Sequence, residues 1–193
     1  RQYVELLTWL HDQLPAGMKL MLLAFDYHYG ENGERRLEAS AFHTPDSYAA
    51  AIAQRYPDRF EWIASIHPYR NDAVAALREA ARNGARAVKW LPPAQGMDPA
   101  SVLCDPFYQT AAELDIPLLI HAGAELAVHG GNTEDFGNPL RLRRPLDQGV
   151  RVIVAHCASL GRGRNSKRLP RFRNTPCRSS VSAAVCKVPS SFP

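Results

Sequence analysis

Four side chains capable of ligand or acid–base chemistry follow apolar runs of strand length. His67 ends the run ASIH, Lys89 lies in AVKWLP, His121 ends PLLIH and His156 ends VIVAH. In parallel α/β proteins, active sites form at the carboxyl ends of the strands, because the loops there converge over the sheet. Histidine is the commonest metal ligand among side chains and suits zinc and other transition metals. These positions therefore predict a catalytic or metal-binding site.

Each of these side chains also has a structural interpretation. A single histidine at a strand end is often only packed or hydrogen-bonded, but His121 and His156 both follow long apolar runs. His67 precedes Pro68, so a role in a turn competes with a role in the site. Two interpretations of Lys89 are equally supported: a residue of the site, or a hydrogen-bonded basic residue at the rim of the sheet. The pair of histidines at 121 and 156 is thus the better supported part of the site.

A further acidic candidate lies at the end of the first apolar run. Asp26 and His28 have the i, i+2 spacing that places two side chains on one face of a strand, as in a two-ligand strand. An aspartate at the mouth of a strand more often faces substrate or a neighbouring loop. We therefore expect Asp26 to contact substrate rather than metal.

Alternating strands and helices must position these residues. Continuous apolar runs that end in polar residues are typical of buried parallel strands, and we expect five, at roughly 18–26, 61–66, 86–91, 116–121 and 150–156. Periodicity, caps, prolines and glycines predict helices over 1–14, 46–57, 71–84 and 105–114, and after Asn138-Pro139. Asn71 is the expected cap of the third helix and Gly84 its left-handed stop, and Pro145 should shorten or kink the last helix. Such alternation requires a parallel sheet covered by helices, either doubly wound or closed as a barrel.

Composition and charge divide the chain into two parts. The 193 residues are 46% hydrophobic and 22% charged, which is typical of a soluble globular domain, and we assign that domain to residues 1–161. Residues 162–193 carry eight Lys or Arg and no acid, whereas residues 1–161 carry 15 basic and 19 acidic residues. The basic segment has no sustained period, so we expect a disordered tail. We interpret it as an out-of-frame reading, with a natural basic extension as the alternative.

The sequence gives no sign of a membrane or of a disulfide framework. It contains no run of about 18 apolar residues, and its start lacks the segments of a signal peptide, so we expect a cytoplasmic protein. The four cysteines, Cys104, Cys157, Cys177 and Cys186, show no CxxC spacing and are expected to be reduced thiols.

Several of these segments together resemble one enzyme family. VKWLP, PLLIHAG and VIVAHCAS follow one another on consecutive βα units, and DRFEWIASIHPYR and GARAVKWLPPAQGMDP precede or include the first of them. In this combination residues 1–160 resemble the amidohydrolase-related metal-dependent hydrolases of the amidohydrolase 2 type. The resemblance implies an incomplete TIM-type (β/α)₈ barrel that covers roughly strands two to six.

The resemblance also implies roles for the candidate residues. His121 would end strand five as a metal ligand, and His156 would end strand six as a second ligand or catalytic base. Lys89 would end strand four, either as a carboxylated lysine that bridges two metals or as a plain catalytic lysine. His67 and Asp26 would bind substrate. The cofactor would be a divalent metal, zinc first, with manganese or iron as alternatives.

The implied reaction is hydrolysis of an amide, ester or lactone in a small molecule, or decarboxylation in some relatives. There the metal lowers the pKa of bound water and polarises a carbonyl while an acid–base residue moves the proton. The family's HxH pair and its last aspartate have no counterpart in this sequence, which leaves open whether the chain itself is active. The intact family also leaves room for a homo-oligomer.

Two other functions compete with this interpretation. A non-catalytic fragment could bind nucleic acid or another anionic partner through the basic tail, but the tail has only Phe172 and Phe192 as aromatics and no groove-reading spacing. An open flavodoxin-like sheet could bind phosphate, but the loop after the first strand offers only Gly30 and Gly33. Both have weaker support than the metal-dependent enzyme.

Overall fold

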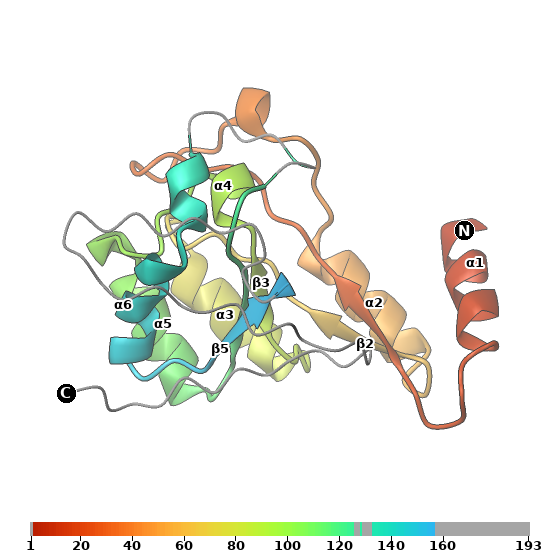
Figure 1. Cartoon of the computed structure of the whole chain (residues 1–193). Helices are drawn as coiled ribbons and strands as arrows, with labels where there is room; N and C mark the ends of the chain where they lie inside the picture. The colour runs from red at the N-terminus through yellow and green to blue at the C-terminus, as the bar shows by residue number, and fades with distance from the viewer. Residues whose placement is uncertain (1, 126–127, 129–132, 157–193) are drawn as a thin grey trace, which may run out of the picture.

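Five short strands form the centre of the molecule, at the positions that the apolar runs predict. The computed structural model describes residues 2–125, 128 and 133–156 (Figure 1). The strands are β1 (Leu20–Leu23), β2 (Phe60–Ile63), β3 (Val88–Trp90), β4 (Leu118–His121) and β5 (Val152–Ala155). Each is shorter than its apolar run. The expected disordered tail, 162–193, lies outside the described residues.

All the strand pairs are parallel and follow the order of the chain. β1 pairs with β2, and β4 lies between β3 and β5. A parallel bridge between Ala64 and Val88 joins the two sets, because the Lys89 N–H donates to the Ala64 carbonyl at 2.7 Å. A doubly wound sheet would reverse its order at a switch point, whereas the order here is that of consecutive barrel strands. The fold is therefore a partial, open (β/α) barrel.

Helices follow the strands as the alternation predicts. The α-helices are α1 (Gln2–His11), α2 (Asp46–Arg55), α3 (Ala73–Arg82), α4 (Pro92–Gln95), α5 (Asp105–Glu113) and α6 (Arg143–Asp147). Short 3₁₀ turns occur at η1 (Leu37–Ala39), η2 (Val102–Cys104), η3 (Glu134–Gly137) and η4 (Pro139–Leu142). In the described part of the chain, no helix has the length and apolar character needed to cross a membrane.

The helix ends follow the expected signals with two differences. Gly84 has a φ of +80° directly after α3, as a left-handed stop requires. The N-cap of α3 is Asp72 rather than Asn71, and its side chain makes no capping hydrogen bond. The helix expected after Pro139 begins as a 3₁₀ turn and continues as the five-residue α6, which contains Pro145. The proline lacks an N–H, so the short helix matches its expected effect.

Trp90, at the end of β3, anchors the core next to Lys89. The Trp90 side chain is fully buried, its ring centroid lies 5.2 Å from Phe107 and 5.7 Å from Tyr108, and its indole N–H donates to the Ile66 carbonyl at 2.8 Å. Burial of each such side chain stabilises the fold by about 1.5–3 kcal/mol. The contacts fix the carboxyl end of β3 against β2 and α5.

α1 lies at the margin of the fold. None of its residues is buried, and Tyr3, Leu6 and Trp9 are at least half exposed. In Figure 1 it stands to one side, near α2 and away from β5. It therefore contributes little to positioning the candidate site.

Candidate functional site

The register of β4 and β5 brings His121 and His156 together. His121 is the last residue of β4 and pairs with Ala155 of β5, so His156 follows at the same edge of the sheet. The two rings are T-shaped, with centroids 5.6 Å apart. The pair predicted from the two apolar runs is thus adjacent in the structure.

His121 is buried and only partly satisfied. Its side chain is 11% exposed, and its Nε2 atom has no hydrogen-bond partner. The carboxylate oxygen Oε2 of Glu125 lies 3.7 Å from Nε2, which is too long for a hydrogen bond. Burial lowers the pKa of His121, Glu125 raises it in part, and Lys89 and His156 lower it further. The lowered pKa favours the neutral ring, which is the form that binds metals.

The loop after His121 is held by a close approach between two glycines. The Gly123 N–H donates to the Gly137 carbonyl at 2.7 Å. A Cβ atom on Gly137 would lie 2.2 Å from the Gly123 carbonyl oxygen, so no larger residue fits there without movement. Glu125 follows this contact by two residues, and its carboxylate lies 3.7 Å from the His121 ring.

His156 occupies an unusual backbone conformation at the last described position. Its φ is +56°, in the left-handed region that residues other than glycine rarely adopt. The residue is exposed, unlike His121. An exposed imidazole beside a buried one leaves the pair open to a ligand on one side.

Lys89 reaches the same edge of the sheet from β3. Its ammonium donates to the Trp90 carbonyl at 2.9 Å. Burial lowers the pKa of Lys89 to about 8, and the charge of Glu125 opposes that shift. Lys89, His121 and Glu125 therefore share one electrostatic environment.

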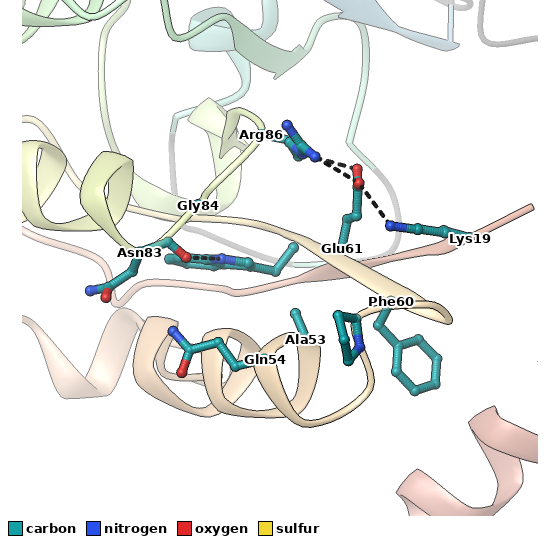
Figure 2. Close-up of a pocket in the computed structure, with 10 residues that line it drawn as sticks. Lys19, Ala53, Gln54, Phe60, Glu61, Asn83, Gly84 and Arg86 are labelled. Atoms are coloured by element: carbon teal, nitrogen blue, oxygen red, sulfur yellow. Dashed lines mark hydrogen bonds and ion pairs between the residues drawn. The ribbon is translucent and has the colours of Figure 1, made fainter.

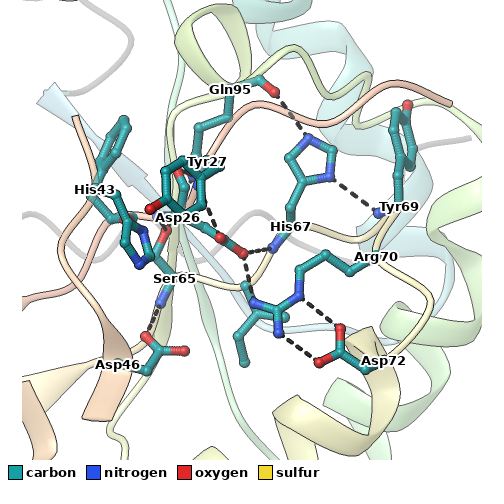
Figure 3. Close-up of polar contacts among 12 residues, drawn as sticks. Asp26, Tyr27, His43, Asp46, Ser65, His67, Tyr69, Arg70, Asp72 and Gln95 are labelled. Carbon is teal, nitrogen blue, oxygen red and sulfur yellow. Dashed lines mark hydrogen bonds and ion pairs between the residues drawn. The ribbon is translucent and has the colours of Figure 1, made fainter. Parts of the chain in front are cut away.

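Asp26 and His67 lie at the ends of β1 and β2, in a separate hydrogen-bonded network that Figure 3 shows. Asp26 is 2% exposed, and its Oδ1 accepts from the Tyr27 N–H at 2.9 Å. Its Oδ2 accepts from the His67 N–H and from the Arg70 guanidinium, both at 2.9 Å. The carboxylate thus joins β1 to β2 and is bonded on both oxygens.

The His67 ring is fully occupied by backbone groups. Nδ1 accepts from the Tyr69 N–H at 3.1 Å, Nε2 lies 2.9 Å from the Gln95 carbonyl, and the residue is 0% exposed (Figure 3). Because Nδ1 is an acceptor, the proton is on Nε2. Burial lowers the pKa of His67 to about 3. Contact of His67 and Asp26 with substrate stays a prediction.

Two residues of these clusters were not predicted from the sequence. Glu125 follows His121 by four residues, and Arg70 follows His67 by three. Arg70 also bonds the exposed Asp72, with distances of 2.7 and 2.8 Å. The sequence did contain a signal for both, because each is a charged residue within four positions of a histidine that ends an apolar run.

The described residues fit a metal only in part. The Nε2 atom of His121 has no hydrogen-bond partner, and His156 supplies a second imidazole beside this ring. Within 2–125, 128 and 133–156, however, no three His, Cys, Asp or Glu residues form a group that could hold a metal ion. The site thus offers two imidazoles rather than a closed ligand set.

A cavity of about 230 Å³ lies at the opposite end of the strands. Its lining includes Lys19, Phe60 and Arg86, which stand at or before the amino ends of β1, β2 and β3. Figure 2 shows Glu61 between Arg86 and Lys19, at 2.8 and 3.5 Å. In barrels this end serves stability rather than catalysis, so we do not assign the site to it.

Similarity to known proteins is found in a family model and in solved structures. A search of the curated proteins found no significant match. Solved structures similar to this chain include an uncharacterised TIM-barrel protein from Bordetella bronchiseptica, with 24% identity, a TM-score of 0.49 and coverage of 62% of this chain and 43% of that one. Another is a putative 2-pyrone-4,6-dicarboxylic acid hydrolase from Pseudomonas putida, with 18% identity, a TM-score of 0.45 and coverage of 72% and 59%.

A third solved structure is a manganese-bound 5-carboxyvanillate decarboxylase from Novosphingobium aromaticivorans, with 20% identity, a TM-score of 0.45 and coverage of 58% of this chain and 38% of that one. The chain thus spans less than two thirds of the length of each of these structures. The family model described as amidohydrolase matches residues 15–184, which is most of the sequence. The chain belongs to the amidohydrolase family.

Proposed function

We propose that this chain carries part of the active site of a divalent-metal-dependent hydrolase or decarboxylase. The observation that carries the proposal is the parallel register of β4 and β5, which places His121 and His156 side by side at the carboxyl edge. Membership of the amidohydrolase family supports it. In this proposal both histidines bind the metal.

A bound divalent metal supplies Lewis acidity toward a substrate carbonyl and toward water. Burial lowers the pKa of His121, which favours the neutral imidazole that can bind a metal. The exposed His156 has room to bind metal or to accept a proton from water. Lys89, with a pKa near 8, is neutral in a substantial fraction of molecules at mildly alkaline pH and is then able to accept a proton.

The substrate class follows from this chemistry. If the reaction is hydrolysis, the carbonyl that the metal polarises belongs to an amide, an ester or a lactone. If carbon dioxide is lost, the substrate is a small molecule that bears a carboxylate. Zinc is the metal that we propose first, because imidazole ligands suit it. Manganese follows, as the metal bound in the 5-carboxyvanillate decarboxylase structure, and iron is the third candidate.

The competing function, in which the basic segment 162–193 binds an anionic polymer, gains no support from the described residues. We therefore propose no second function.

The test is metal content. Protein purified without chelators should contain zinc, manganese or iron by elemental mass spectrometry, and a His121→Ala, His156→Ala double variant should lose it. His11→Ala is the matched control, because His11 ends α1, far from this edge of the sheet. Equal metal in the double variant, or no metal in the unmodified chain, would refute the proposed site.

A further inference from the structure

The sequence contains two Asn-Gly pairs, Asn32-Gly33 and Asn83-Gly84. In such a pair the backbone nitrogen of the glycine can attack the Cγ atom of the asparagine side chain, because glycine has no Cβ atom to hinder the approach. Both asparagines are exposed, so the access of water does not distinguish the two sites. The local structure therefore decides which pair reacts.

Asn32 lies in an exposed turn, with its side chain folded over the next peptide bond. The Gly33 N–H donates to the Gly30 carbonyl at 2.9 Å, which closes the turn. The Glu34 N–H donates to Oδ1 of Asn32 at 3.2 Å, and Nδ2 of Asn32 donates to the Glu34 carboxylate at 2.7 Å. The bond to Oδ1 forms an Asx turn, whose hydrogen-bonded ring contains both the Gly33 nitrogen and the Asn32 Cγ atom. It also stabilises the negative charge that develops on Oδ1 when the nitrogen attacks.

Asn83 is the C-cap of α3, and its backbone is bonded to the helix and to the core. The Asn83 N–H donates to the Glu79 carbonyl and the Gly84 N–H donates to the Ala81 carbonyl, both at 3.0 Å. The Asn83 carbonyl accepts from the indole N–H of the buried Trp62, also at 3.0 Å (Figure 2). Rotation of the 83–84 peptide toward the side chain would leave that buried N–H without an acceptor, whereas water can replace the bonds of an exposed turn.

We propose that Asn32 is a site of spontaneous deamidation in the folded chain and that Asn83 is protected from it. The Gly33 nitrogen bonds to Cγ of Asn32, and the bond from Cγ to the side-chain nitrogen breaks. The proton of the Gly33 N–H is transferred through solvent to that nitrogen, which leaves as ammonia. Water then opens the cyclic imide at either carbonyl, which gives aspartate or isoaspartate, so the co-reactant is water.

The reaction changes the loop between β1 and α2. The product has a carboxylate where the Asn32 amide bonded Glu34, so a hydrogen bond becomes a contact between like charges. A Cβ atom on Gly33 would lie 3.0 Å from the Tyr69 carbonyl oxygen, so the turn packs against the backbone just before Arg70. Isoaspartate adds one carbon to the main chain of this turn. Deamidation therefore disturbs the loop next to the contact between Arg70 and Asp26.

The experiment uses the full chain without additions. The folded protein is incubated in mildly alkaline buffer, and peptide mapping by mass spectrometry follows the conversion of each asparagine to its two acidic products. The same incubation in urea is the matched control, because the unfolded chain retains only the Asn-Gly chemistry that both sites share. Asn32→Ser and Asn83→Ser assign the isoaspartate of the intact chain to one site, and circular dichroism checks that each protein is folded.

In the folded chain, Asn32 should react at least about tenfold faster than Asn83, because reaction at 83 leaves the buried Trp62 N–H unpaired. In urea the two rates should become similar. Isoaspartate in the intact folded chain should disappear in Asn32→Ser and persist in Asn83→Ser. Similar rates at the two sites in the folded chain, or a faster reaction at Asn83, would overturn the proposal. Reaction of Asn32 in urea alone would also overturn it, because the turn would then protect the amide.

Discussion

The carboxyl edge of the sheet contains two polar clusters that differ in how fully they are satisfied. At the ends of β1 and β2, Asp26 and His67 have protein partners on both carboxylate oxygens and on both ring nitrogens. At the ends of β3, β4 and β5, His121 Nε2 has no partner and Lys89 has a lowered pKa. The polar groups of the first cluster are hydrogen-bonded within the protein, whereas in the second the buried His121 Nε2 has no hydrogen-bond partner.

The difference matters because the residue types are the same. Both clusters contain a histidine that ends an apolar run and a nearby carboxylate, so type and spacing alone do not separate them. A buried group with all its bonds made rigidifies the structure, and one with a bond missing lowers stability until a ligand supplies it. Perturbed groups of the second kind are enriched at functional sites.

The largest expected effect tests the first cluster. Asp26→Ala removes a buried partner of Arg70 and of the His67 N–H, and the loss of one member of a buried pair typically costs about 3–5 kcal/mol. His121→Ala should change the free energy of unfolding of the metal-free chain by less than about 1 kcal/mol, because removal of an unpartnered polar atom offsets lost packing. Urea denaturation followed by tryptophan fluorescence measures both.

A control distinguishes the buried carboxylate from its neighbour. Asp72 bonds the same Arg70 but is 62% exposed, so Asp72→Ala should cost no more than about 1 kcal/mol. If His121→Ala cost as much as Asp26→Ala, the second cluster would be structural like the first, and the contrast between them would disappear.

The second expected effect is a pH dependence from Lys89. Burial places its pKa at about 8 in the folded chain, below the ordinary value of 10.5. The unfolded chain therefore binds the proton more tightly, and stability should rise with pH between about 8 and 10.5 as the folded chain loses its buried charge. Lys89→Met should be more stable than the unmodified chain at pH 7, by about 1–3 kcal/mol.

The same variant should lack that rise. Denaturation at pH 7, 8, 9 and 10 compares Lys89→Met with Lys19→Met, since Lys19 is 40% exposed and pairs with Glu61 at the opposite end of the strands. Parallel pH profiles for Lys89→Met and the unmodified chain would show that Lys89 keeps an ordinary pKa, and would remove it from the candidate acid–base residues.

The strands, the main helices and the His121–His156 pair could be predicted from the sequence. Apolar periodicity is a local signal, and in consecutive parallel strands the carboxyl ends meet at one edge whatever the details of packing. The short α4, opened by Pro92-Pro93, was not predicted, because no apolar period marks four residues. The strand ends also lay inside the predicted runs.

The partners of each polar group could not be predicted. His67 is occupied by the Gln95 carbonyl, 28 residues away, and Asp26 bonds Arg70, 44 residues away. Such contacts depend on how loops fold back over the sheet, which a single sequence does not encode in any short pattern. The same holds for Glu125, whose carboxylate reaches His121 only through the turn that Gly123 and Gly137 fix.

The smallest expected effect concerns the backbone of the second cluster. His156 has a φ of +56°, and a residue with a Cβ atom in this region costs roughly 1–2 kcal/mol. His156→Gly and His156→Ala both lack the imidazole, so the two variants differ mainly in backbone strain. Glycine relieves this strain, at a small cost because it increases the entropy of the unfolded chain. His156→Gly should therefore be the more stable by about 0.5–1 kcal/mol, whereas at exposed, helical Arg82, with no positive φ, alanine should be the better residue. Equal stability of the two variants would mean that the backbone at position 156 is not strained. The positive φ of His156 would then be an ordinary turn conformation and would give no support to a role in the site.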